Sequence, residues 1–216
     1  AQDPQTRKGI PEAEMRRRCH KTYAYLKRFE KQLRERSGYR KYFDPRDPFY
    51  SMYNVGPYTM APWKVVWREQ STRFQVSVVG AQSGTQPALP DHKLMLIPCD
   101  GHRNEAHYLC AALGSSPAVF VVASYVLQTS TSTHVLEHVE VPKYIAGDPV
   151  HRQLGRLSEA AHDARAKGQQ RKLEEIESAI DECAAELWGL KERELAAIQR
   201  ALRSQRGDAE TSEEET

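Results

Sequence analysis

Residues 93–113 read Lys-Leu-Met-Leu-Ile-Pro-Cys-Asp-Gly-His-Arg-Asn-Glu-Ala-His-Tyr-Leu-Cys-Ala-Ala-Leu, and a change of period within them decides the fold class. Residues 94–97 form a continuous apolar run, typical of a strand, and Asp100-Gly101 is a turn sequence. We expect Asn104 to cap a helix. The apolar residues that follow at helical spacing are Ala106, Leu109, Cys110 and Leu113.

Strands are also predicted on both sides of this stretch. Val65, Val66 and Trp67 form a short apolar strand core, and residues 74–79 alternate between apolar and polar side chains. Residues 80–90 form a loop rich in Gly, Pro, Ser and Gln. Downstream, Pro117 opens a second helix that reaches residue 127, and residues 135–141 predict a further strand. The sequence therefore predicts an α+β fold with a small, mostly antiparallel sheet and packed helices.

Helices are expected at both ends of the chain. Residues 11–37 carry a helical stripe that ends at Gly38, which predicts one N-terminal helix. Residues after Gly147 predict a helical hairpin or bundle, with a last helix over residues 192–203. Its longest stripe, whose spacing favours packing within the chain over a dimeric coiled coil, is Leu173, Ile176, Ile180, Cys183, Leu187 and Leu190.

These patterns divide the chain into four expected segments. They are a linker helix and loop (1–46), an α+β domain (47–146), a helical segment (147–206) and a disordered acidic tail (207–216). No run of about 18 apolar residues and no secretion signal is found, so we expect a cytoplasmic protein. The four scattered cysteines are then expected to be reduced thiols.

Charge is distributed unevenly along the chain. The net charge is +2, yet residues 1–50 hold 14 Lys/Arg against 7 Asp/Glu, and residues 207–216 hold five acids and no base. A basic front of this kind predicts a surface that faces a polyanion. If that polyanion is DNA, the expected phosphate contacts are Lys21, Lys27, Arg28, Lys31, Arg34 and Arg36.

Residues 50–73 interleave aromatic side chains with bases and amides. Arg and Lys can bond guanine edges, Asn and Gln can bond adenine edges, and aromatic rings can stack on bases. With two nearby loops, the predicted base-reading residues are Tyr58, Lys64, Arg68, Gln70, Arg73, Arg103, Asn104, Thr131 and Thr133. No metal site is expected, because the pairs His102/His107 and His134/His138 have no neighbouring acid or cysteine that completes a ligand set.

Several segments, taken in order, resemble the C-terminal target-recognition region of large adenine-specific DNA methyltransferases, found in fused type II restriction–modification systems and in phage defence. Tyr-Ala-Tyr-Leu at 23–26, with Arg-Ser-Gly at 36–38, resembles their linker helix. Residues 49–58 and 61–68 are similar to the opening of their target-recognition domain. Residues 105–113, 141–144 and 187–190 resemble three later elements, although Gly114-Ser115 replaces the usual Asn-Ser. The likeness covers residues 11–203.

This resemblance implies a parent enzyme that methylates the exocyclic amine of adenine with S-adenosylmethionine, in a catalytic domain that we expect N-terminal to Ala1. That domain needs a glycine-rich turn for the cofactor and an Asp/Asn-Pro-Pro-aromatic tetrapeptide for the flipped adenine. Neither occurs here, since residues 47–50 read Asp-Pro-Phe-Tyr. We therefore expect no activity and no cofactor in this chain, with double-stranded DNA and the catalytic domain as its partners.

Two other functions fit the same residues. The C-terminal helices could dock a restriction or defence subunit, which would make the chain a protein-interaction module. The aromatic and basic residues could instead bind the unstacked bases of RNA.

Overall fold

The computed structural model describes residues 1–81, 87–91, 93–99, 102–125 and 133–213. It is an α+β structure, as the sequence predicted. The chain divides into two compact units, Ala1–Ala61 and Pro62–Thr216, here called the N-terminal unit and the C-terminal unit. The boundary lies between residues 61 and 62, whereas the sequence placed one between 46 and 47.

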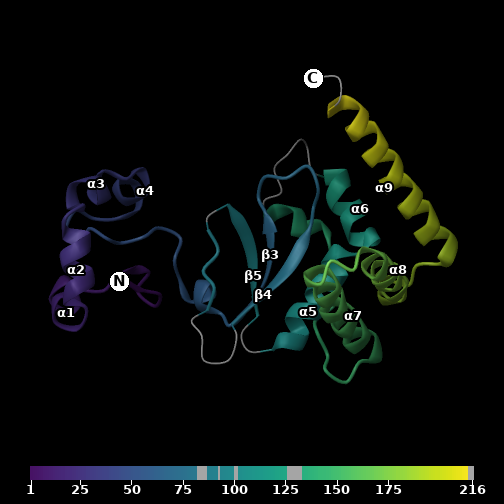
Figure 1. The fold of residues 1–216 in the computed structure, drawn as a ribbon, viewed down its shortest axis with the longest axis horizontal. Helices are drawn as coiled ribbons and strands as arrows, with labels where there is room; N and C mark the ends of the chain where they lie inside the picture. Colours follow the sequence, from purple (N-terminus) through teal and green to yellow (C-terminus); the bar gives the residue numbers. More distant parts are fainter. Residues whose placement is uncertain (82–86, 92, 100–101, 126–132, 214–216) are drawn as a thin grey trace. The chain divides into compact units, whose positions relative to one another are not determined.

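The N-terminal unit replaces the expected single helix with four short ones (Figure 1). They are α1 (Glu12–Arg18), α2 (His20–Lys27), α3 (Glu30–Glu35) and α4 (Ser37–Tyr42), preceded by the short strands β1 (Gln2–Asp3) and β2 (Lys8–Gly9). The prediction of one helix over residues 11–37 was wrong, and so was its end at Gly38, which lies inside α4.

The breaks in this helix serve the packing of the unit. The backbone leaves the helical region at Cys19 (φ −135°, ψ 48°) and at Arg36 (φ −55°, ψ 136°). A core then forms around Met15, Tyr23, Phe49 and Tyr50, whose aromatic rings meet edge to face. A straight helix would carry some of its stripe past this small core, so tertiary contacts override the local helical preference.

The sheet of the C-terminal unit has three antiparallel strands in the order β4-β3-β5. They are β3 (Trp63–Arg68), β4 (Val76–Gly80) and β5 (Leu94–Cys99), close to the predicted positions. Val65 packs with Cys99 against Ala106 and Cys110 of α5 (Arg103–Gly114). That helix begins one residue before Asn104, and its N-cap residue is His102, so the predicted cap was wrong.

The remaining helices pack against α5 or against one another (Figure 1). They are α6 (Ser116–Tyr125), α7 (Pro149–Ala166), α8 (Gln170–Leu187) and α9 (Glu192–Glu213). Asp148 caps α7 by accepting the amide hydrogens of Val150 and His151 at 2.8 and 3.0 Å. The α8 stripe packs onto Tyr108 and Leu154, which confirms packing within the chain.

Two further expectations differ from the structure. Residues 133–138 form a short 3-10 helix, η2 (Thr133–His138), and no described residue between 133 and 141 belongs to a strand. Leu136, Val139 and Val141 nevertheless pack against the α5 core, so their apolar alternation reflects burial without strand pairing. Helix α9 continues past residue 203 to Glu213, through residues for which the sequence predicted disorder.

A search of the described helices finds none that is by itself long and apolar enough to cross a membrane; α5 and α6 reach the criterion only as a pair, bent by 62°.

Candidate nucleic-acid interface

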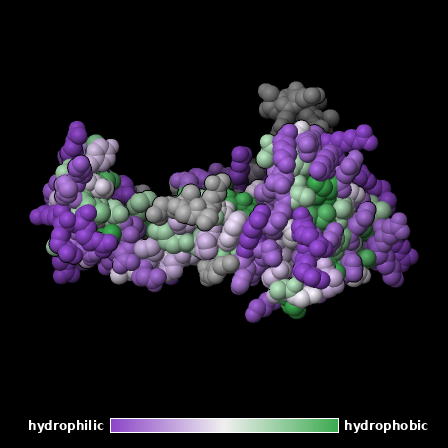
Figure 2. Space-filling view, turned by 60° about the horizontal axis from the view of Figure 1, so that its bottom comes forward, coloured by the Kyte–Doolittle hydropathy of each residue, from purple (hydrophilic) through white to green (hydrophobic). Residues whose placement is uncertain are grey.

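The two units carry opposite net charges. The N-terminal unit holds 14 of the 31 Lys/Arg and 7 of the 29 Asp/Glu, a net +7. The C-terminal unit holds the other 17 bases and 22 acids, a net −5. The surface drawn in Figure 2 is strongly hydrophilic over the N-terminal unit. Attraction for a polyanion is therefore concentrated in the first 61 residues.

The six predicted phosphate contacts fall into two groups. The side chains of Lys21, Arg28 and Lys31 are exposed and form no ion pair or hydrogen bond with any residue that the structure describes. Lys27 and Arg34 both pair with Glu30, which lowers the pKa of that carboxyl chiefly through the hydrogen bond from Lys27. The first three are the side chains available to a phosphate.

Arg34 and Arg36 have structural partners instead. Arg34 also donates to the hydroxyl of Tyr39 and to the carbonyl of Pro45, both at 2.9 Å. Arg36 donates to the carbonyls of Leu33, Phe49 and Ser51 at 2.8, 3.2 and 2.8 Å. Of the predicted phosphate contacts, these two hold the loops of the N-terminal unit together.

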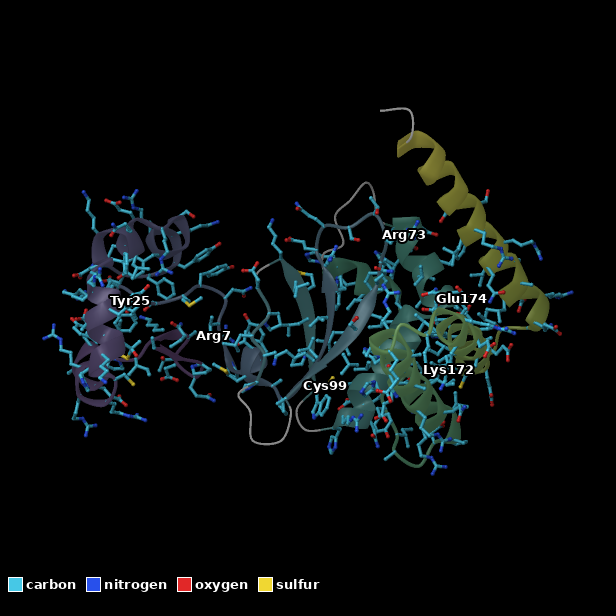
Figure 3. All side chains as sticks on the ribbon, viewed as in Figure 1. Arg7, Tyr25, Arg73, Cys99, Lys172 and Glu174 are labelled. Carbon is cyan, nitrogen blue, oxygen red and sulfur yellow. The ribbon has the colours of Figure 1, made fainter. Side chains whose placement is uncertain are left out.

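The predicted base-reading residues lie at two ends of the sheet. Arg68, Gln70 and Arg73 are exposed at the end where β3 finishes. Arg103 and Asn104 begin α5 near Trp63, at the other end of β3, and the Arg103 guanidinium lies 5.7 Å from the Trp63 ring centroid. Figure 3 shows the corresponding separation between Arg73 and Cys99, the latter paired with Trp63.

The length of β3 decides how these groups can be used. A six-residue strand spans about 16 Å, or roughly five base-pair steps. The two groups therefore do not form one reading loop. Arg103 is paired with Glu159 at 3.2 Å. Arg68, Gln70 and Arg73 are exposed and lie within six residues of one another in the sequence.

Two of the other predicted base-reading residues, Lys64 and Tyr58, are less available. Lys64 is 1% exposed in the middle of β3, and burial lowers its pKa. Tyr58 is half-buried, and its hydroxyl donates to the carbonyl and side-chain oxygens of Asn54 at 2.8 and 2.6 Å. Thr133 begins η2, and Thr131 lies outside the described residues. Lys64 lies on the face of β3 opposite to Val65, and that face is buried as well, which leaves its side chain almost no exposed surface.

A polar cluster lies buried between α5 and α7. His107 Nδ1 is 3.0 Å from Ser158 Oγ, while His162 Nε2 accepts the amide hydrogen of Val78 at 3.0 Å and so covers the open edge of β4. Burial lowers the pKa of His107 to about 4 and raises that of Cys110 to about 12. Both groups are neutral at pH 7, so Cys110 is a thiol and not a reactive thiolate.

The structure also exposes aromatic side chains that are not among the predicted base-reading residues. Tyr25 (58% exposed) and Phe29 (38%) meet on the basic helices, and Tyr42 and Tyr53 stack with ring centroids 3.7 Å apart. Phe29 had been assigned to the apolar stripe, and the helix break beside it explains its exposure. Among the described residues, no group of three or more His, Cys, Asp or Glu side chains could hold a metal ion.

No protein-family model matches this sequence, and no curated protein matches it.

Proposed function

We propose that this chain is the DNA-binding, target-recognition region of a site-specific adenine DNA methyltransferase, and that its N-terminal unit provides the main contact with the duplex. The observation that carries the proposal is the +7 charge of that unit, with Lys21, Arg28 and Lys31 exposed and unneutralised by any described acid. Each such side chain that meets a phosphate releases condensed counterions, which makes binding salt-dependent.

The assignment to a methyltransferase rests on the resemblance of residues 11–203 to that family, and an α+β fold is compatible with it. On this proposal the parent enzyme uses S-adenosylmethionine and acts in the cytoplasm, in restriction–modification or phage defence. Chemistry belongs to the separate catalytic domain, since this chain has neither the glycine-rich turn nor the adenine-holding tetrapeptide.

Base reading is proposed for Arg68, Gln70 and Arg73. They are exposed and close in sequence at one end of the sheet, in a unit whose net charge does not itself attract DNA. Phosphate contacts position a protein on the duplex, whereas contacts with base edges specify the sequence. The two roles are therefore assigned to different units.

Filter binding of a duplex over a series of salt concentrations tests the main contact. The triple variant Lys21→Ala, Arg28→Ala and Lys31→Ala removes three unpaired charges, so the slope of log K against log [salt] should become shallower by up to about 2.7, or about 0.9 per contact. The matched control is Lys167→Ala, Lys172→Ala and Arg193→Ala, which removes the same charge from exposed sites of the C-terminal unit. Equal slopes for the two variants would show that the N-terminal unit is not the contact.

One observation favours the second candidate, a protein-interaction module. Helix α6 is apolar around its whole circumference, yet Val119, Phe120 and Val121 are only half-buried. A helix of this composition is normally fully covered. A duplex affinity that does not change with salt, together with a partner subunit that protects α6 from hydrogen exchange, would favour this function over DNA binding.

A further inference from the structure

Two tyrosines of the N-terminal unit form an exposed stack. Tyr42 ends α4 and Tyr53 lies eleven residues later in a loop, yet their rings are almost parallel, at 9°, with centroids 3.7 Å apart. They are 44% and 52% exposed, and Met52 beside them is 51% exposed. Two large aromatic side chains thus remain in water in contact with each other, and exposed apolar side chains that gather in this way are typical of a contact surface.

The loop that presents Tyr53 is held on both sides. Gln2 bonds both backbone groups of Met52, accepting its amide hydrogen at 3.0 Å and donating to its carbonyl at 3.1 Å. Asn54 has a left-handed backbone (φ 61°) and receives the Tyr58 hydroxyl. Arg36 fixes the carbonyl of Ser51 at 2.8 Å. The exposed ring is therefore preorganised, so a ligand would not have to order the loop on binding.

Positive charge surrounds the stack. The Lys41 ammonium lies 5.0 Å from the Tyr42 ring centroid, and Arg40 is exposed without an ion-pair partner among the described side chains. The whole unit carries +7. An apolar protein partner would have to cover this charge, whereas a polyanion with flat apolar rings complements both features.

We propose that the Tyr42–Tyr53 stack binds an unpaired base of single-stranded nucleic acid, while Arg40 and Lys41 contact the adjoining phosphates. Stacked aromatic rings within a basic surface are the combination with which proteins bind single strands without reading their sequence. The proposal goes beyond duplex binding by the same unit, because a paired base does not offer its ring face to a side chain.

Fluorescence anisotropy with labelled oligo(dT) tests the stack, with an abasic oligonucleotide of the same length and a duplex as parallel probes. Tyr42→Ala and Tyr53→Ala should each weaken oligo(dT) binding about 5- to 150-fold, the equivalent of one base–aromatic stack. Tyr53→Phe keeps the ring and should bind as the wild type does. Tyr125→Ala is the matched control, because Tyr125 is 56% exposed and stacks on His138 in the C-terminal unit; its affinity should not change.

Three outcomes would overturn the proposal. They are equal binding of abasic and oligo(dT) strands by the wild type, full affinity in the alanine variants, and a loss of affinity in Tyr53→Phe as large as that in Tyr53→Ala. In any of these cases base stacking would not explain the binding. The explanation would then be the positive charge by itself, the tyrosine hydroxyl group or a protein partner. Oligo(U) distinguishes the sources, since equal binding means that unpaired RNA and DNA are both ligands.

The failure of this proposal is distinct from failure of the proposed duplex contact. Loss of duplex binding in the Lys21, Arg28 and Lys31 triple variant, with no effect of Tyr42→Ala on oligo(dT), would reject the stack alone. Strong oligo(dT) binding that depends on Tyr42 and Tyr53, without measurable duplex binding, would reject the duplex contact alone. Protection of the buried Gly9 amide, which donates to Ser51 Oγ at 2.8 Å, verifies that each variant remains folded.

Discussion

Substitution of Arg36 should separate structural from DNA-binding arginines in the N-terminal unit. Its guanidinium joins the α3–α4 junction to the segment at residues 49–51 through three carbonyl groups, at 2.8, 3.2 and 2.8 Å. Sequence reasoning had grouped it with the phosphate contacts because of its charge alone. The structure predicts a loss of stability on truncation, without a specific loss of DNA contact.

The size of the loss follows from these bonds. A hydrogen bond that involves a charged group contributes about 1.5–3 kcal/mol, and a buried group left without its partner costs a further desolvation penalty. The Arg36 side chain is only half-buried, so water can replace part of what is lost. We therefore expect Arg36→Ala to lower the free energy of unfolding of this unit by about 2–3 kcal/mol. Arg36→Lys should lose less but not recover the wild type, because an ammonium cannot reproduce the fork.

Native-state hydrogen exchange measures this loss within the unit itself, which matters because all three tryptophans lie in the C-terminal unit. The Gly9 amide and the amides of α2 are suitable probes. Arg28→Ala is the matched control, since Arg28 is exposed and should change stability by less than about 0.5 kcal/mol while weakening duplex binding. If Arg36→Ala were as stable as Arg28→Ala and weakened binding equally, Arg36 would be a phosphate contact and the structural argument would be wrong.

Three further predictions concern the C-terminal unit. Asp181→Ala removes three hydrogen bonds of 2.6–2.8 Å from α6 and α9, and it should lower the free energy of unfolding in urea by about 3 kcal/mol, with a smaller effect for Asp181→Asn. Gly80→Ala places a Cβ 2.0 Å from the Trp63 ring and should cost about 2–3 kcal/mol, whereas Gly147→Ala, with no atom within 4 Å, should be neutral in the same urea titration. His107 has a folded pKa of about 4 against an ordinary value of 6.5, so the unfolded state binds its proton first; stability should be complete above pH 6.5 and fall by up to about 3 kcal/mol towards pH 4. His107→Gln should flatten that pH dependence, and an unchanged profile would assign it to another group.

The elements that sequence reasoning located correctly are those in which local and tertiary preferences agree. In α5 and α8 the apolar residues recur every three or four positions; the α5 stripe is buried against the sheet, and the α8 stripe is buried against α5 and α7. Gly189, which follows the C-cap residue Trp188 of α8, adopts a left-handed backbone (φ 66°), the conformation that favours glycine at this position. The spacing of the apolar residues is enough to predict such a helix, because its apolar face is buried by the rest of the chain.

The elements that sequence reasoning missed depend on contacts between residues far apart in the sequence. Residues 135–141 have the alternation of a strand, but no neighbouring strand pairs with them, and the carbonyl of Pro142 instead accepts the Tyr108 hydroxyl at 2.7 Å. The N-terminal helix breaks because Phe49 and Tyr50 bring a core to it from more than twenty residues away. Neither effect leaves a local signal.

The candidate site shows the same limit more sharply. Residue type identified the bases that could meet DNA, but not which of them already bond carbonyls, as Arg36 does, or lie buried in a strand, as Lys64 does. Both facts depend on the folded chain. Composition counts the two side chains as available surface charges, whereas the structure does not leave them available.

The division of charge constrains how the two units can act on DNA. Exposed charges interact over a Debye length of about 10 Å at 0.1 M salt, so Arg68 and Arg73 attract only phosphates that are already close. Within that distance the net charge of −5 on the C-terminal unit opposes the approach of DNA, and added salt screens this repulsion as well as the attraction by the N-terminal unit at +7. The measured slope of log K against log [salt] therefore reflects both the attraction by the N-terminal unit and the repulsion by the C-terminal unit. The control substitutions at Lys167, Lys172 and Arg193 remove positive charge and make the C-terminal unit still more negative. An unchanged salt slope in that control would therefore indicate that this unit lies outside the main electrostatic contact.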